Sequence, residues 1–350
     1  MSKKESQAMY GIAIFLMRAH HIWGSHAMIQ FSYLSVVRPD VVHDIGWFCK
    51  ICVAMYAFLS GYGLSASYST EKERTPKAYS SFVMDRAFSF MKFVWCTELV
   101  VIPVGLLTGY FQRISIWTII KCIFGFAGDL GQAHWYISEY LLMLLLFPLL
   151  NEAGEAIRKI STRYRILTLA AAAVVFAIGY LLTPFSLLNT ARIMCLIVFF
   201  EGLLCQKLGV FELLVRKPDW IYGAIIFMAC LGIRCFVSNA STYCAIDSLL
   251  IVPFMTGLLM MLRKSNELYK DILVWYGKYS KYIWLTHCMV LTVMNPFLKR
   301  FPEASKILVF GIAGATLFGM ATRLAEIGIR TGTKLLCEKV KTAFRCKGNN

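Results

Sequence analysis

An arginine and three histidines stand close together in an otherwise apolar segment near the N-terminus. The stretch GIAIFLMRAHHIWGSH, residues 11–26, contains Arg18, His20, His21 and His26. An ionisable side chain inside a bilayer costs at least about 2.5–3.5 kcal/mol to insert, so such residues usually have partners and often mark a functional site. Because an imidazole titrates near neutral pH, it can take a proton from a hydroxyl group and return it. The segment therefore indicates acid–base chemistry, with a buried hydrogen-bonding histidine as the simpler alternative.

Helical rotation singles out His21 within this segment. At about 100° per residue, Tyr10, Arg18 and His21 fall within one sector of about 80°, whereas His20 lies to one side. At about 1.5 Å per residue, the two adjacent histidines begin about 15 Å from the cytoplasmic end of the apolar run, near the middle of the bilayer. A metal site is a weaker interpretation, because adjacent histidines point to different faces and no carboxylate lies nearby. We therefore expect proton transfer without a metal ion.

Other ionisable residues lie within or at the edges of later apolar segments. His287, in YSKYIWLTHCMVL, falls about five residues into one of them, and Glu98, Arg192 and Glu201 fall in others. Membership in a structural pair explains each of these about as well as catalysis does.

Two further features have structural explanations that we favour. Trp135 and Tyr136 fit an aromatic belt at the membrane interface. The small residues of FLSGYGLSAS, residues 58–67, permit close packing of helices. The functional alternative for this second stretch is an exposed backbone that a ligand approaches.

The elements that must position these side chains are membrane-spanning helices. The chain has 350 residues, of which 58% are hydrophobic and only 16% charged, with a mean hydropathy of +0.61. A soluble domain would carry about 25% charged residues. A span needs about 20 apolar residues, and ten runs qualify: 9–31, 46–66, 88–108, 135–151, 166–184, 191–208, 219–236, 243–262, 281–298 and 306–324. The short segment 114–128 is better explained as an interfacial or re-entrant piece.

The charge pattern predicts the orientation of these spans. The net charge is +16, but most Lys and Arg residues lie in short segments between apolar runs, so the charge indicates topology rather than nucleic-acid binding. By the positive-inside tendency, both termini are cytoplasmic. We expect a cytoplasmic tail at 1–8, a membrane domain at 9–325 and a basic cytoplasmic tail at 326–350. The twelve cysteines lie mostly inside apolar runs and are interpreted as small buried apolar residues.

Four motifs carry a resemblance to a known family. YGIAIFLMRAHH, FLSGYGLSASY, HWYISEYLLMLLLFPLL and GKYSKYIWLTHCMVL occur in an order and spacing that resemble the integral-membrane acyltransferase type-three family. That family includes bacterial O-acetyltransferases of polysaccharides and other cell-surface molecules. The resemblance covers roughly residues 9–325. It implies a fold of about ten spans in a bacterial inner or plasma membrane. It also implies transfer of an acyl group from cytoplasmic acetyl-CoA or another acyl-CoA to a hydroxyl group of a glycan or glycoside.

The resemblance also assigns candidate residues. In the family, the first span carries a basic residue followed eleven positions later by an essential histidine, which His21 matches. The basic position, with its role in binding the donor, is Tyr10 here, and Arg18, one turn before His21, is our candidate to compensate. We predict that His21 is the general base on the acceptor hydroxyl, while Arg18 and His20 orient or polarise the acyl carbonyl. A late histidine of the family matches His287, which would complete the cavity.

A basic segment after the second span of the family matches MDRAFSFMKFVW. Its Arg86 and Lys92 are candidates for binding the phosphates of coenzyme A, although a positive-inside topology explains them equally well. The rival function is a transporter or flippase of an anionic or glycan substrate, but the sequence has no paired, broken halves typical of such proteins. A scaffolding membrane protein leaves the intramembrane ionisable residues unexplained.

Overall fold

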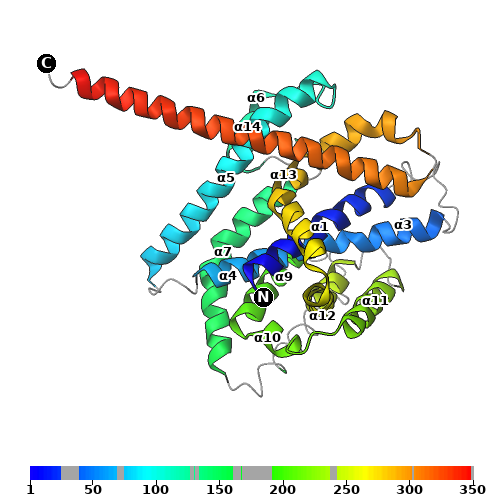
Figure 1. The fold of residues 1–350 in the computed structure, drawn as a ribbon. Helices are drawn as coiled ribbons and strands as arrows, with labels where there is room; N and C mark the ends of the chain where they lie inside the picture. The colour runs from blue at the N-terminus through cyan, green and yellow to red at the C-terminus, as the bar shows by residue number, and fades with distance from the viewer. Residues whose placement is uncertain are drawn as a thin grey trace.

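The structure is a computed structural model that describes residues 1–24, 39–68, 75–126, 130, 134–160, 167, 191–236, 243–301 and 303–347, with the backbone alone at residues 39, 334 and 336–347. Within these ranges it contains helices and no strand (Figure 1). The elements are α1 (Lys3–Trp23), α3 (Pro39–Phe48), η1 (Cys49–Ile51), α4 (Cys52–Tyr68), α5 (Pro76–Leu107), α6 (Ile116–Ile123), α7 (Trp135–Lys159), α9 (Ala191–Lys207), α10 (Val210–Leu214), α11 (Trp220–Phe236), α12 (Tyr243–Lys264), α13 (Glu267–Leu298) and α14 (Ala304–Lys347).

Each predicted apolar run except the one at 166–184 overlaps a helix within the described residues, although α5, α13 and α14 extend well beyond their runs. The run at 166–184 lies almost entirely outside the described residues. Five helical segments are long and apolar enough to cross a membrane on their own: Asp40–Tyr68, Pro76–Leu107, Trp135–Lys159, Tyr243–Lys264 and Ala304–Thr333. The all-helical membrane fold is thus confirmed, whereas the count of ten spans and the orientation of the termini stay predictions. α6 has eight residues, too few to cross a bilayer.

Two expected domain boundaries do not coincide with helix ends. α1 begins at Lys3, because Ser2 and Glu5 form a reciprocal capping box at its start. Most of the expected N-terminal tail at 1–8 is therefore helical. At the other end, α14 continues from Ala304 to Lys347 without a break. Figure 1 shows this helix crossing the bundle and extending beyond it.

Glycines bring α4 and α9 into backbone contact. A Cβ on Gly61 would lie 1.9 Å from the carbonyl oxygen of Phe199, and one on Gly202 would lie 2.1 Å from that of Phe58. Small residues permit such close approach between membrane helices. The packing explanation of the stretch at 58–67 is therefore confirmed at Gly61, whereas Gly63 has no atom within 4 Å of where its Cβ would be.

The same device joins α1 and α13. A Cβ on Gly277 would lie 1.9 Å from the carbonyl oxygen of Gln7, and one on Gly11 would lie 2.1 Å from that of Leu273. The two backbones are thus locked side by side along the first half of α1. This contact fixes the register of the two helices that carry the histidines.

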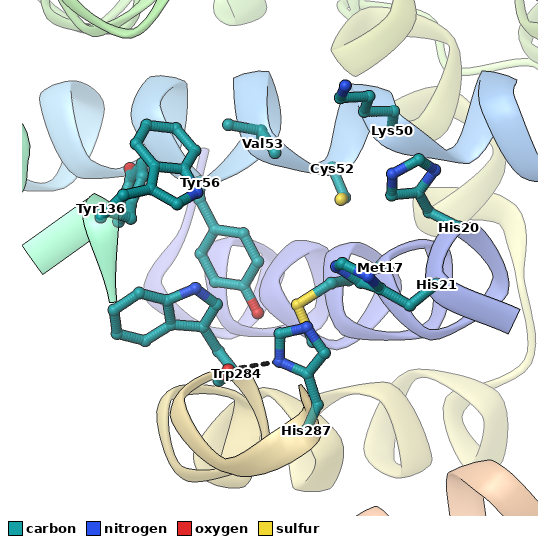
Figure 2. Close-up of a pocket in the computed structure, with 11 residues that line it drawn as sticks. Met17, His20, His21, Lys50, Cys52, Val53, Tyr56, Tyr136, Trp284 and His287 are labelled. Carbon is teal, nitrogen blue, oxygen red and sulfur yellow. Dashed lines mark hydrogen bonds between the residues drawn. The ribbon is translucent and has the colours of Figure 1, made fainter. Parts of the chain in front are cut away.

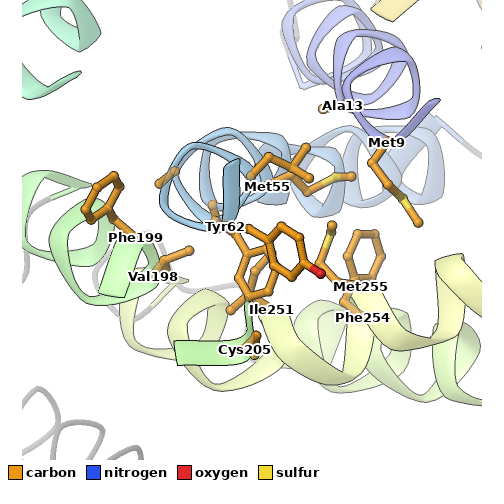
Figure 3. Close-up of a cluster of buried hydrophobic side chains, with 14 of the residues drawn as sticks. Met9, Ala13, Met55, Tyr62, Val198, Phe199, Cys205, Ile251, Phe254 and Met255 are labelled. Atoms are coloured by element: carbon orange, nitrogen blue, oxygen red, sulfur yellow. The ribbon is translucent and has the colours of Figure 1, made fainter. Parts of the chain in front are cut away.

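A buried apolar cluster fills the space between α1, α4, α9 and α12 (Figure 3). Because lipid tails are as apolar as these side chains, close packing rather than exclusion of water holds such helices together. The residues of the cluster drawn with labels are Met9, Ala13, Met55, Tyr62, Val198, Phe199, Cys205, Ile251, Phe254 and Met255.

Candidate active site

His21 and His287 meet because α1 and α13 start together and run in the same direction. Near their starts, Lys4 pairs with Glu267 at 3.0 Å. His21 lies 18 residues after Lys3, the first residue of α1. His287 lies 20 residues after the start of α13. At about 1.5 Å per residue, both histidines are about 27–30 Å along their helices. α13 therefore begins well before the apolar run expected at 281–298, and His287 lies much deeper in its helix than the sequence predicted.

The two histidines line a cavity of about 250 Å³ between α1, α4, α7 and α13 (Figure 2). Of the residues proposed from the sequence, His20, His21 and His287 reach it. The complete lining is Met17, His20, His21, Lys50, Cys52, Val53, Tyr56, Trp135, Tyr136, Trp284 and His287.

The imidazoles form a connected group in the cavity wall. The ring centroids of His21 and His287 are 4.5 Å apart, and those of His20 and His21 are 5.0 Å apart. Nδ1 of His20 lies 2.9 Å from the carbonyl oxygen of Gly46 in α3. That oxygen is only an acceptor, so Nδ1 of His20 carries the proton. His20 is thus anchored by a hydrogen bond, whereas the ring of His21 contacts other rings.

His287 has a defined tautomer. Its Nδ1 lies 2.5 Å from the carbonyl oxygen of Trp284, one turn earlier in α13, and must donate its hydrogen to that oxygen. Nε2 therefore carries a lone pair in the neutral ring. Sγ of Cys288 lies 3.2 Å from this Nε2, and a thiol can donate to it. From the sequence we interpreted the cysteines as small buried apolar residues, so this contact was not predicted.

Arg18 is buried but does not line the cavity. Its Nη2 donates to the carbonyl oxygen of Gly311 in α14 at 2.6 Å, and its Nη1 donates to that of His287 at 3.3 Å. Only 1% of its surface is exposed. Arg18 thus holds α1 against α13 and α14, and this placement favours positioning of His287 over direct contact with an acyl carbonyl.

The residues predicted to bind the donor lie apart from the histidines. Tyr10 packs against Tyr56 with ring centroids 5.6 Å apart. It thus contacts a cavity residue but is not itself part of the cavity lining. Arg86 stands over the ring of Phe82, 5.1 Å from its centroid. Lys92 is also on α5, 4.3 Å from the ring centroid of Phe88. Both cations are exposed, and their role with coenzyme A stays a prediction.

Several lining residues were not proposed from the sequence. The hydroxyl groups of Tyr56 and Tyr136 are buried and have no well-aligned hydrogen-bond partner in the described part of the chain. Figure 2 shows the phenol of Tyr56 extending from α4 toward α1 and α13. Trp135 and Tyr136, interpreted as interfacial anchors, are part of the cavity wall. An aromatic residue has the same sequence pattern in a cavity wall and in an interfacial belt, and the anchoring role of the pair stays a prediction.

Lys50 is a cavity residue that could have been identified from the sequence. It lies inside the apolar run 46–66 and is subject to the same argument that singled out Arg18. Its Nζ lies 4.0 Å from the ring centroid of Tyr243 and 4.9 Å from that of Trp47. Cation–π contacts thus stabilise the positive charge of Lys50 in one wall of the cavity.

The other ionisable residues noted in the sequence lie outside this lining. Glu98 pairs with His134 at 2.9 Å, and Arg192 pairs with Glu139 at 3.1 Å. These contacts favour the structural explanation for Glu98 and Arg192. One carboxylate oxygen of Glu201 is buried without a hydrogen-bond partner within the described ranges. His26 lies outside those ranges.

One group of side chains has a spacing that a metal ion could use. Ligand atoms of His21, His287 and Cys288 lie within 4.8 Å of one another. Two imidazoles and a thiolate suit zinc in type. However, the buried guanidinium of Arg18 is hydrogen-bonded to the carbonyl oxygen of His287, and a fixed positive charge there opposes a cation. We therefore treat the group as acid–base and nucleophilic chemistry.

The fold and the site together define a class: a helical membrane protein with a cavity lined by two facing histidines. The family model for the type-three acyltransferase domain matches residues 7–323, and the chain belongs to that family. The protein is therefore an acyltransferase. Neither the curated proteins nor the solved structures gave a match to the chain.

Proposed function

We propose that this enzyme moves an acyl group, with acetyl as the favoured group, from cytoplasmic acyl-CoA to a hydroxyl group of a cell-surface glycan or related glycoside. We place it in a bacterial inner or plasma membrane. The observation that carries the proposal is the pair of facing imidazoles, His21 and His287, in one cavity. An acyl acceptor needs a base for its hydroxyl proton, and a neutral imidazole is such a base.

His21 is the proposed base on the acceptor. Its ring lies in the cavity wall and contacts the rings of His20 and His287. A nitrogen of His21 can therefore face an incoming hydroxyl group, accept its proton as the oxygen attacks the acyl carbon, and pass it to the leaving thiolate. His20, hydrogen-bonded to Gly46, holds the position of the adjacent ring.

The acyl oxygen gains negative charge as the new bond forms, and hydrogen-bond donors must already be in place there. Tyr56 and Tyr136 supply two buried hydroxyl groups in the cavity without well-aligned partners within the described ranges. We assign the donation to Tyr56, whose ring extends toward the two histidines (Figure 2). Tyr10 packs against that ring and so positions Tyr56.

The lining also supports the proposed acceptor class. Trp135, Trp284 and the two tyrosines present broad, rigid, apolar faces beside a few polar groups. Such walls suit a ligand with apolar ring faces and a rim of hydroxyl groups, as a sugar has. Arg86 and Lys92 remain the candidates for the phosphates of coenzyme A, on the exposed surface of α5.

The transporter alternative has weaker support. A transporter would use His21, Lys50 and Arg18 to bind an anionic substrate, but Arg18 donates to two backbone carbonyl oxygens. Membership of an acyltransferase family favours group transfer.

The first test replaces His21 with glutamine in a producing strain. We expect base-labile acyl esters on the cell-surface glycans to fall at least about 100-fold relative to wild type, because general-base catalysis contributes about 10²–10⁴-fold. Mass spectrometry of the glycans before and after mild alkali measures the esters, with strains lacking the protein as the baseline.

His43→Gln is the matched control, since His43 lies on α3 and is not part of the cavity lining. It should leave the ester content unchanged. Normal ester content in the His21→Gln strain, at a normal protein level, would remove His21 from the mechanism. Equal ester content with and without the whole protein would refute the proposed acceptor class.

A further inference from the structure

A cysteine beside the two histidines has the contacts of a nucleophile, and the proposed function does not use it. We propose that Cys288 accepts the acyl group from acyl-CoA as a covalent thioester and then passes it to the acceptor hydroxyl. This inference rests on the proposed function, because it divides that transfer into two steps.

The first support is the contact between the thiol and a base of known tautomer. Nδ1 of His287 donates to the carbonyl oxygen of Trp284, so Nε2 has the lone pair. Sγ of Cys288 lies 3.2 Å from that nitrogen. A nucleophile within hydrogen-bond reach of a base, which a third group holds in place, is the arrangement of activated cysteines. The carbonyl oxygen of Trp284 is the third group here.

The second support is the positive charge beside the thiol. Arg18 is buried, and its guanidinium donates to the carbonyl oxygen of His287, which belongs to the peptide unit joining His287 to Cys288. A neighbouring guanidinium favours the thiolate, which is the reactive form of cysteine. Arg18, predicted to act on the substrate, would instead act by favouring the nucleophile.

The third support comes from the cavity. Cys288 is not among its lining residues, but the thiol contacts His287, which lines the cavity. The cavity volume of about 250 Å³ is below the range of about 300–1,000 Å³ usual for ligand sites. A thioester arm and a sugar are therefore expected to occupy it in turn rather than together. The ligand atoms of Cys288, His287 and His21 lie within 4.8 Å of one another, so an acyl group on Sγ would be beside His21, the base for the second step.

The proposed transfer takes place in two steps. In the first step, the proton on Sγ moves to Nε2 of His287 while Sγ attacks the acyl carbon, and the bond from that carbon to the sulfur of coenzyme A breaks. The leaving thiolate takes the proton from Nε2 and departs as free coenzyme A. In the second step, the acceptor oxygen attacks the same carbon and gives its proton to His21. The bond to Sγ breaks, an ester forms, and Cys288 regains a proton from His21.

This scheme explains why the site has two facing histidines. His287 serves the thiol and His21 serves the acceptor hydroxyl. It predicts a reaction that needs no acceptor: exchange of the acyl group between acetyl-CoA and free coenzyme A, through the thioester on Cys288.

The test uses the full-length protein purified in detergent or nanodiscs, with acetyl-CoA and isotopically labelled free coenzyme A. Wild type is expected to form labelled acetyl-CoA without an acceptor and to gain the mass of one acetyl group, which peptide mass spectrometry places on Cys288 and neutral hydroxylamine removes. Cys288→Ala and the nearly isosteric Cys288→Ser are expected to lower the exchange at least about 100-fold. Cys235→Ala is the matched control, because Cys235 is another half-buried cysteine, on α11, and should exchange like wild type.

The outcomes separate the two proposals. Glycan esters that depend on the protein but persist at wild-type levels with Cys288→Ala would overturn the covalent step and leave the proposed function standing. Exchange that survives in both Cys288 variants, or a wild type that transfers acetyl groups without exchange, would overturn it as well. If the strain shows no protein-dependent esters at all, the proposed function fails and the covalent step fails with it.

Discussion

At the scale of single residues, Arg18 and His21 share one face of α1 but have different surroundings. Because one helical turn separates them, we predicted a chemical role for both from the sequence. In the structure, the longer side chain of Arg18 reaches two backbone carbonyl oxygens, whereas His21 lies in the cavity wall. Their substitutions should therefore have different consequences.

Replacing Arg18 with methionine should lower stability as well as activity. The variant loses two charge-assisted hydrogen bonds that join α1 to α13 and α14, each worth about 1.5–3 kcal/mol. Thermal unfolding in detergent, followed by size-exclusion chromatography, should show a lower midpoint for Arg18→Met. His21→Gln should unfold like wild type. An unchanged midpoint for Arg18→Met would contradict the role of Arg18 in holding the helices together.

Tyr56→Phe tests the proposed donor to the acyl oxygen. The change keeps the ring and removes only a hydroxyl group that is buried without a well-aligned partner within the described ranges. We expect acyl transfer to fall about 10²–10³-fold, the usual cost of losing one oxyanion donor, with no loss of stability. Tyr222→Phe, at an exposed position on α11, should behave as wild type. Transfer at the wild-type rate in Tyr56→Phe would assign the donation elsewhere.

At the scale of helices, glycines set the distances on which the site depends. Gly277 and Gly11 lock α1 against α13, and Gly61 and Gly202 lock α4 against α9. Since α1, α4 and α13 form three walls of the cavity, its shape follows from these backbone contacts. The sequence suggested close packing at 58–67 but did not identify the partner helix, because a small residue has no side chain that selects one.

Gly61→Ala and Gly63→Ala, two residues apart on α4, provide a matched comparison. A methyl group on Gly61 would meet the carbonyl oxygen of Phe199, whereas one on Gly63 has open space. We expect Gly61→Ala to destabilise the protein by about 1–3 kcal/mol through overpacking. Gly63→Ala should be neutral or stabilising by up to about 1 kcal/mol, because alanine is the better helix former. Equal unfolding midpoints for the two variants would contradict the close backbone contact between α4 and α9 at Gly61.

At the scale of the whole molecule, three basic segments that the positive-inside tendency assigns to the cytoplasmic side lie together at one end of the bundle. They are the N-terminal segment with Lys3 and Lys4, the segment at 216–217 and the segment at 263–281. The N-terminal amino group pairs with Glu212 at 2.8 Å, close to the segment at 216–217. Glu5 pairs with Arg263 at 2.7 Å, and Lys4 pairs with Asp271 at 2.9 Å. The contacts agree with the grouping of these segments, and the side of the membrane on which they lie is still a prediction.

Reporter fusions test that orientation. The positive-inside tendency predicts that a fluorescent protein attached after residue 350 matures and emits light in the cytoplasm, because the tail from Arg330 onward is rich in Lys and Arg. Alkaline phosphatase attached at the same point should be inactive. Active phosphatase would reverse the orientation of the whole domain.

The all-helical membrane fold and the family could be predicted from the sequence, which also made His21 and His287 candidate site residues. Long apolar runs leave helices as the backbone structure that satisfies its own hydrogen bonds in lipid, and ionisable residues inside such runs are conspicuous. Lys50 is likewise an ionisable residue inside an apolar run. Only the packing of the helices shows that His21 faces His287, that Arg18 supports the helices, and that Tyr56 and Tyr136 line the same cavity. It also placed Cys288 against a base. These relations join helices far apart in the chain, and their register depends on backbone contacts at glycines, which a hydropathy pattern does not encode.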